Sequence, residues 1–299
     1  MLRKPIIIKD ERNIKELKTK NNIKLSLKKH LNNFGLKFFN SYDNYFKWQI
    51  QCLDNINLSD NEKNKYFNFL NKNKLNKNYK LPTSFYDLIA SNRRLSVITH
   101  SMKSNDILYN GVSIINDLND CKNILDIGCN LGYLTSFYSK VFKNSNIIGL
   151  DKSKKSILLA SEVFHKKKYN NLCFTYDYNF LKDINFDYIC DTQCLFSLNK
   201  KNLFNLLDIF KLQLVDNGKI ISISNIPGHL SAKYYLQLFK KKDFFIDSIS
   251  PIFVKNIYGI QAFTKIIFTR ENKKKKYNLK NYYTNLRKKI SMVNLHNLL

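Results

Sequence analysis

The stretch NILDIGCNLGYLTSFYSKV, residues 123–141, decides the fold. A short apolar run leads to Asp126, and two glycines four residues apart follow it, Gly128 and Gly132. The whole chain has only eight glycines, so a pair in one turn indicates a backbone requirement at this point. The rest of the stretch is aromatic and apolar. The pattern predicts a strand, a tight turn and a helix whose free N–H groups face whatever the turn holds.

The segments that follow continue this alternation of strand and helix. We expect strands at 123–127, 146–150, 172–176, 186–191, 219–224, 247–254 and 261–269. We expect helices near 133–142, 153–166, 200–214 and 229–242. The alternation predicts an α/β fold with a doubly wound, seven-stranded, mostly parallel sheet. The last two strands leave no room for a helix between them, so they should pair as an antiparallel hairpin at or near the sheet edge.

Residues 1–109 have a different pattern, which predicts a helical N-terminal region. Ser59 and Asp60 are candidates for a helix N-cap, and the polar run 71–80 is expected to be an exposed connection. An aromatic cluster between Phe38 and Trp48 is expected to form a core for this region, with a lid over a substrate cleft as the alternative. The basic extension 271–299 is expected to be a solvated helix or a frayed end.

The composition bounds the function classes. The net charge is +27, but lysines are spread along the chain, and Lys, Asn, Ile, Phe and Tyr are abundant together. Compositional bias with solvated lysine faces is therefore the favoured explanation, and a surface that binds a polyanion is the alternative. No stretch approaches the roughly 18 apolar residues of a membrane span. Six cysteines without CxxC spacing predict reduced thiols, and the protein is expected to be cytoplasmic.

The carboxylate before the turn discriminates between ligands. In a doubly wound sheet, ligands bind at the carboxyl ends of the strands, near the point where strand order reverses. A dinucleotide site usually has the pattern G-x-G-x-x-G, which seats a pyrophosphate. Here the pattern is D-x-G-x-N-x-G, and a carboxylate in this position would repel a pyrophosphate. It would suit an ammonium or a sulfonium, which favours S-adenosylmethionine over NAD.

The segment ILDIGCNLG resembles motif I of the class I S-adenosylmethionine-dependent methyltransferases, and the match continues in order through about residues 110–270. NIIGLDKSKKSILLASE resembles the second strand of that family and the acid that ends it, and LCFTYDYNFL resembles the third. NFDYICDTQCLFSL is similar to the fourth strand and its loop. LQLVDNGKIISIS is similar to the turn before strand five, with Asn217 and Gly218 in the turn. The terminal hairpin is also what the family's sheet order implies.

The resemblance implies a set of cofactor-binding residues. In that family the acid after the second strand binds the ribose hydroxyls, which implies Asp151 here. The acid after the third strand implies Asp177 at the adenine edge, with Tyr178 beside the ring. Asn130 stands where many members have glycine, and Asn tolerates the left-handed conformation. The implied set is Asp126, Gly128, Asn130, Gly132, Asp151, Lys152, Asp177, Tyr178 and Asp191.

Simpler roles remain open for several of these residues. Asp126 could cap the helix that follows it, Asp151 could cap the helix near Ser153, and Asp177 could be a loop acid. Cys129 is expected to be a buried filler. Some RNA cytosine methyltransferases attack from a cysteine after strand four, but they resemble a Pro-Cys pattern and this chain reads DTQCLFSL. Packing is therefore the favoured role for Cys194 as well.

The sequence offers no clear catalytic base and no metal site. His100 and His229 could border the cleft, but a surface or packing role is favoured for both. The loop after the fourth strand has no Asn-Pro-Pro-Tyr-like pattern, which argues against methylation of adenine amino groups. It resembles the loop of the broad small-molecule methyltransferase group.

The leading hypothesis is a methyltransferase that moves a methyl group to a small-molecule acceptor by in-line displacement. One alternative is an RNA methyltransferase whose basic termini bind the polyanion. A second is a cofactor-binding scaffold without catalysis. The methyl acceptor and the oligomeric state are open at this point.

Overall fold

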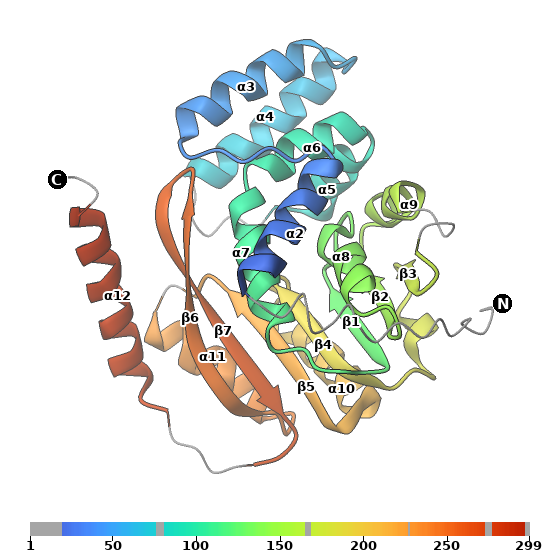
Figure 1. Cartoon of the computed structure of the whole chain (residues 1–299), viewed down its shortest axis with the longest axis vertical. Coiled ribbons are helices and arrows are strands. Elements are labelled where there is room, and N and C mark those ends of the chain that lie inside the picture. Colours follow the sequence, from blue (N-terminus) through green and yellow to red (C-terminus); the bar gives the residue numbers. More distant parts are fainter. Residues whose placement is uncertain (1–19, 76–80, 165–168, 227, 273–276, 297–299) are drawn as a thin grey trace.

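The computed structural model describes residues 20–75, 81–164, 169–226, 228–272 and 277–296, and these build around one seven-stranded sheet (Figure 1). The strand order is β3-β2-β1-β4-β5-β7-β6. Strands β1 to β5 pair in parallel, and β7 pairs antiparallel with β5 and β6. The predicted sheet and its terminal hairpin are confirmed. The bounds are β1 (Asn123–Ile127), β2 (Asn146–Leu150), β3 (Leu172–Thr175), β4 (Phe186–Thr192), β5 (Leu214–Ser224), β6 (Phe245–Asn256) and β7 (Gly259–Thr269).

Two apolar cores lie on opposite faces of the sheet. Successive strand residues point to opposite faces, so Ile124 and Ile147 enter one core while Leu125 and Ile148 enter the other. A strand buried on both sides needs a continuous apolar run, which explains sequences such as NILDI and NIIGL. One core packs against α7 (Ser104–Ile115), α8 (Tyr133–Val141) and α9 (Lys154–Val163). The other packs against α10 (Lys200–Gln213), α11 (His229–Lys240) and α12 (Leu279–His296).

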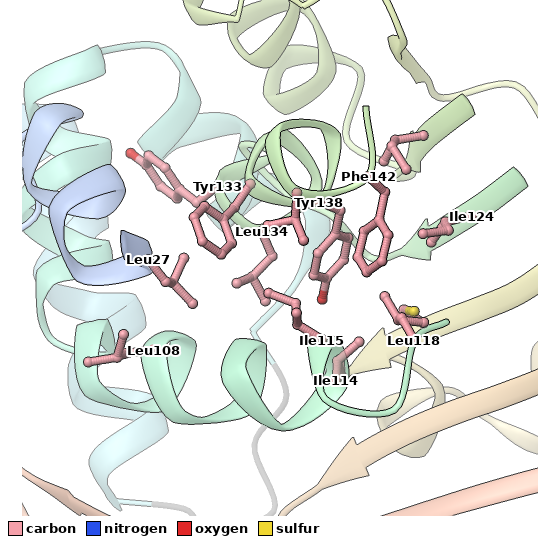
Figure 2. Close-up of a cluster of buried hydrophobic side chains, with 14 of the residues drawn as sticks. Leu27, Leu108, Ile114, Ile115, Leu118, Ile124, Tyr133, Leu134, Tyr138 and Phe142 are labelled. Carbon is pink, nitrogen blue, oxygen red and sulfur yellow. The ribbon is translucent and has the colours of Figure 1, made fainter. Parts of the chain in front are cut away.

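Helix α2 (Lys20–Asn33) belongs to the first of these cores. Figure 2 shows Leu27 of α2 between Leu108 of α7 and Leu134 of α8. The helices approach closely at Gly111 of α7, where a Cβ atom would lie 2.5 Å from Leu134 Cδ2. A polar contact adds to this packing, because the buried His30 Nε2 lies 2.9 Å from the Oγ of Ser136 on α8. The predicted boundary after residue 109 falls inside α7.

The helices α3 (Tyr42–Asp54), α4 (Asp60–Leu75), α5 (Thr83–Ala90) and α6 (Arg93–Ser101) bury apolar residues in a separate cluster. The predicted cap is confirmed, since Ser59 N donates to Glu62 Oε2 and Glu62 N donates to Ser59 Oγ. In the aromatic cluster, Tyr45 is buried and Phe46 is exposed, so only one face of α3 is core. The exposed connection expected at 71–80 is wrong for 71–75, which continue α4, and 76–80 lie outside the described residues.

Within the C-terminal extension, Leu279–His296 forms helix α12, so the expected helix is confirmed, but one face of it packs on the sheet instead of being solvated. Tyr283 and Leu286 of α12 are buried against β7 and α11. The Tyr283 hydroxyl lies 3.2 Å from Thr264 Oγ1 of β7. These residues, with Ile290, follow the helical spacing of an apolar stripe, which the surrounding Lys and Arg residues obscure in the sequence.

Strand β5 begins at Leu214, five residues before the predicted start. Leu214 pairs with Phe186 and Lys219 pairs with Tyr188, so five residues of β5 span two of β4. The turn expected at Asn217 and Gly218 is therefore an irregularity within β5 rather than a turn before it. Regular pairing starts at Lys219, where the strand was predicted to begin.

Candidate functional site

The turn between β1 and α8 lies at the carboxyl edge of the sheet and has three residues with positive φ. They are Gly128 (68°), Asn130 (49°) and Gly132 (71°). The backbone N–H groups of Gly128 and Cys129 both donate to the carbonyl oxygen of Leu150, the last residue of β2 (2.8 and 3.2 Å). The turn is therefore fixed to the neighbouring strand, and asparagine fits its middle position because it tolerates the left-handed region.

The two glycines permit neighbouring side chains to close on the turn. A Cβ atom at Gly132 would lie 2.3 Å from Cε1 of Phe174 in β3. A Cβ atom at Gly128 would lie 2.5 Å from the Cβ of Cys194, in the loop after β4. The backbone requirement that the sequence indicated at these glycines is therefore both a left-handed conformation and the close packing of Phe174 and Cys194.

Asp126 is a buried carboxyl at this edge. Thr135 Oγ1, in the first turn of α8, donates to Asp126 Oδ2 at 2.5 Å. Burial raises the pKa of Asp126 to about 7 against the opposing Thr135 hydrogen bond, and the carboxyls of Asp191 and Asp151 add to the rise. The N-cap of α8 is Gly132, so Asp126 contacts a side chain of that helix and does not cap it.

Asp151 lies at the same edge as Asp126, because β1 and β2 stay in register to their last residues. Asn130 N donates to Asp151 Oδ2 (3.0 Å) and Ser153 N donates to Oδ1 (2.9 Å). Burial raises the pKa of Asp151, and these two hydrogen bonds oppose the rise. The N-cap of α9 is Ser153, whose Oγ accepts from Ser156 N, so the capping alternative for Asp151 is wrong.

Asp191 is fully buried, and both of its oxygens have protein donors. Oδ1 accepts from the N–H groups of Cys194 and Leu195 (2.8 and 2.9 Å), and Oδ2 accepts from Ser222 Oγ (2.6 Å). Burial raises the pKa of Asp191 to about 6. These contacts fix the loop after β4 and so hold Cys194 against Gly128. Direct binding of a cofactor by Asp191 stays a prediction.

The residues predicted at the adenine edge are exposed. Asp177 caps η1 (Tyr178–Leu181) by accepting from Asn179 N at 2.9 Å, which agrees with the loop-acid alternative. Tyr178 is 36% exposed. Burial raises its pKa to about 12, with contributions from the thiol of Cys194 and the carboxyl of Asp151, so its hydroxyl lies near the Asp151 edge. Lys152 is exposed beside Asp151.

Helix α5 brings two residues to this edge that the sequence analysis did not identify. Asp87 Oδ1 accepts a hydrogen bond from Ser153 Oγ at 2.7 Å, which fixes α5 to the start of α9. Burial raises the pKa of Tyr86, the residue before Asp87, to about 12, and the carboxyl of Asp151 and the thiol of Cys194 add to the rise. Local sequence carries no signal for these contacts, since helical periodicity identifies α5 but not its partner. Helix α5 therefore approaches the site through Asp87.

The two candidate bases do not lie together. The Nδ1 of His100, on α6, donates to the carbonyl oxygen of Ser96 at 2.7 Å, and its ring centroid lies 5.6 Å from that of Tyr133. Burial lowers the pKa of His100 to about 4, so it is neutral and weakly basic at pH 7. His229 is the first residue of α11, which packs on the opposite face of the sheet.

The thiols near the turn are unreactive. Cys129 and Cys194 are both free, and burial raises the pKa of each well above its ordinary value. Both thiols are therefore protonated at neutral pH and poor nucleophiles. This chemistry agrees with the packing role that the sequence favoured for Cys194.

A family model described as a methyltransferase domain matches residues 118–280, more than half of the chain. The chain belongs to this family. Its methyltransferase domain is an enzyme domain, and its cofactor is S-adenosylmethionine. This agrees with the resemblance seen at the glycine turn. No curated protein sequence matches the chain.

Several solved structures are similar to the methyltransferase domain. A putative O-methyltransferase from Nostoc punctiforme is 15% identical, with a TM-score of 0.45 over 61% of this chain and 60% of that one. A TehB-like S-adenosylmethionine-dependent methyltransferase from Corynebacterium glutamicum is 16% identical, with a TM-score of 0.46 over 61% of this chain and 98% of that one. This chain thus spans about three fifths of the first structure. Because both TM-scores are low, the family assignment depends on the family model alone.

Two absences hold for the part of the chain that the structure describes. No helix there is long and apolar enough to cross a membrane. The same residues contain no group of three or more His, Cys, Asp or Glu side chains arranged to hold a metal ion.

Proposed function

We propose that this chain transfers the methyl group of S-adenosylmethionine to a small-molecule acceptor by in-line displacement. The observation that carries the proposal is the edge formed by Asp126, the glycine turn and Asp151. Two carboxyls with raised pKa values lie at one end of adjacent parallel strands, where ligands of doubly wound sheets bind. Strand order reverses between β1 and β4, so the edge lies at the switch point of the sheet.

The residues at this edge fit the cofactor. Asn130 Oδ1 is buried and has no hydrogen-bond partner among the described residues. Such an atom costs free energy until a donor reaches it, and the ammonium group of the cofactor is a suitable donor. The raised pKa values of Asp126 and Asp151 also indicate a site suited to a cation, because a nearby positive charge would stabilise the ionised carboxylates.

The residues of the chain would mainly bind, orient and exclude water. When bound, the cofactor supplies a methyl group already activated on a sulfonium, and the methyl–sulfur bond breaks as the bond to the acceptor forms. Asp151 would accept hydrogen bonds from the ribose hydroxyls, and Asn130 and Asp126 would bind the amino-acid end. Tyr86 and Tyr178 would shield the Asp151 side from water. Alignment of this kind is worth about 7–11 kcal/mol of activation free energy.

The weak basicity of His100 bears on the acceptor. A group with a pKa of about 4 removes few protons from an alcohol or an amine at pH 7. His100 is therefore a poor candidate for the base. An acceptor atom that is already ionised, or one that attacks as a neutral lone pair, needs no base.

Calorimetry with S-adenosylhomocysteine tests the cofactor site. Asp151→Asn keeps the shape and removes the charge, so affinity should fall about 10- to 100-fold, as expected for lost hydrogen bonds to a charged group. Asp183→Asn removes an exposed carboxylate outside the site and should leave affinity unchanged. If the wild-type protein binds no S-adenosylhomocysteine, the proposal fails.

The acceptor class is tested by incubation with labelled S-adenosylmethionine and a cell extract. The label should enter small solutes when RNA, protein, lipid and solute fractions are separated. The net charge of +27 favours RNA as the second candidate. Label confined to RNA, together with RNA binding that weakens steeply as salt is added, would replace the small-molecule proposal.

A further inference from the structure

A cavity of about 640 Å³ opens between α10 and α11, beside the loop that follows β4. This volume is in the range of small-molecule sites. Phe196 and Tyr235 line it, with ring centroids 5.3 Å apart in an edge-to-face arrangement. Leu230 and Tyr234 also line it and are 71% and 55% exposed, so they stand at its opening. The cavity thus has aromatic walls and an apolar entrance, which suits a flat apolar ligand.

A buried hydroxyl group of a residue that lines the cavity has no partner among the described residues. Ser224, the last residue of β5, is 2% exposed and lines the cavity. Its Oγ makes no hydrogen bond with any of the described residues. Buried hydroxyls nearly always have a partner, and one without a partner loses free energy relative to its hydrated state. A ligand that carries a hydrogen-bonding group at this point would recover that loss.

The charges around the cavity favour an anion. Lys200, in the first turn of α10, lines it, and none of the described lining residues is Asp or Glu. Helix α11 begins beside it, and the N-cap of α11 is Gly228, which has no side chain to bond the first N–H groups. Ser231, in that first turn, is also a lining residue. A helix start without a cap carries partial positive charge, which adds to that of Lys200.

One loop separates this cavity from the edge that holds the cofactor. Gln193 and Phe196 face the cavity, while Cys194, between them in the sequence, packs on Gly128 of the turn. Asp191 fixes the loop through the N–H groups of Cys194 and Leu195. A molecule in the cavity therefore lies next to the residues that cover the glycine turn.

We propose that this cavity binds the methyl acceptor, and that the acceptor is an aromatic molecule carrying an anionic group, such as a carboxylate or a phenolate. The assignment of the bound molecule as methyl acceptor rests on the proposed function, whereas binding of an aromatic anion by the cavity does not. The ring lies against Phe196 and Tyr235, and the anionic group is held by Ser224, Lys200 and the start of α11.

Two fluorescent probes test the binding claim. 8-Anilinonaphthalene-1-sulfonate is an aromatic anion, and N-phenyl-1-naphthylamine has the same ring system without the sulfonate. The anion should bind one per chain and more tightly than the neutral probe. Ser224→Ala should weaken binding of the anion about tenfold. It should not lower the unfolding temperature, because the hydroxyl group makes no hydrogen bond with the described residues that the substitution would remove.

The lysine supplies a matched pair of variants. Lys200→Gln should weaken binding of the anion up to about fivefold and leave the neutral probe unaffected. Lys201→Gln removes the adjacent exposed lysine, which does not line the cavity, and should change neither probe. The proposal is overturned if the neutral probe binds as tightly as the anion, or if Ser224→Ala and Lys200→Gln leave binding of the anion unchanged.

Cofactor binding and methyl transfer separate this inference from the proposed function. Lys200→Gln should keep the wild-type affinity for S-adenosylhomocysteine and lower the transfer of label to anionic aromatic solutes. Labelled products that are all uncharged would overturn the acceptor assignment. If the wild-type protein binds the aromatic anion but no S-adenosylhomocysteine, the proposed function fails and the binding claim stands.

Discussion

Helix α2 and the group α3 to α6 both precede the sheet in the chain, but they are held in different ways. Leu27 of α2 is fully buried in a core that it shares with β1 and α8 (Figure 2). The helices α3 to α6 bury Phe85, Ile89 and Leu95 among themselves, and one of them, α5, meets the Asp151 edge through Asp87. The N-terminal region is therefore not one lid. Helix α2 is part of the framework of the sheet, and α3 to α6 are a cap with its own core.

Substitution of Leu27 should give the largest loss of stability. Leu27→Ala should lower the free energy of unfolding by about 3–4 kcal/mol, because it leaves a cavity in the core of the sheet. Leu25, on the same helix, is 67% exposed, so Leu25→Ala should change that free energy by less than about 0.5 kcal/mol. Urea unfolding measures both. If the two variants lose the same free energy of unfolding, α2 is not part of the framework of the sheet.

A second comparison concerns two glycines with positive φ. Gly132→Ala should cost about 2–3 kcal/mol, because the new Cβ meets both a left-handed backbone and the ring of Phe174. Gly259, in the β6–β7 hairpin, also has positive φ, but a Cβ there meets nothing within 4 Å, so Gly259→Ala should cost only about 1–2 kcal/mol. Only Gly132→Ala should also weaken binding of S-adenosylhomocysteine. If the two variants are equally stable, Phe174 does not restrict the turn.

The strands of the sheet and the helices before it also differ in how well the sequence predicts their contacts. Two continuous apolar runs and a fixed parallel register place Asp126 and Asp151 at one edge, so local patterns were enough to bring these two together. The contact of Asp87 with Ser153 joins residues 66 positions apart, and helical periodicity does not specify the partner of a helix. The stripe of Tyr283 and Leu286 was missed because lysines and arginines surround it. The bounds of β1 and β2 follow from local sequence here, whereas the partners of helices do not.

The dependence of cofactor affinity on pH should follow Asp126. Its pKa is about 7, so it is mostly protonated at pH 6 and mostly ionised at pH 8. A sulfonium favours the ionised form, so the affinity for S-adenosylmethionine relative to neutral S-adenosylhomocysteine should rise up to about tenfold between pH 6 and pH 8. Calorimetry with both ligands at each pH measures the ratio. Asp126→Asn should remove the dependence, and a ratio that is flat in the wild-type protein would exclude Asp126 from the sulfonium's surroundings.

Ionisation of Asp126 should lower the stability of the ligand-free protein, although it raises the affinity for the cofactor. The pKa of Asp126 in the folded chain lies above the value of about 3.9 for an unfolded Asp. The folded chain therefore binds this proton more tightly, and the contribution of Asp126 to stability falls as pH rises from about 4 to about 7. Thermal unfolding without ligand should show a smaller loss over this range in Asp126→Asn than in the wild-type protein.

The smallest expected effect tests whether the group of helices α3 to α6 takes part in cofactor binding. Asp87→Ala removes the acceptor of the Ser153 hydroxyl, so it should cost about 1 kcal/mol of stability and weaken S-adenosylhomocysteine binding about threefold, since Ser153 N is a donor to Asp151. Ser84→Ala, at an exposed position of the same helix, should do neither. If Asp87→Ala loses stability but keeps full affinity, α5 is only a structural neighbour of the site. If affinity falls as expected, the cap, although it has its own core, helps to set the geometry of the Asp151 edge through a single hydrogen bond.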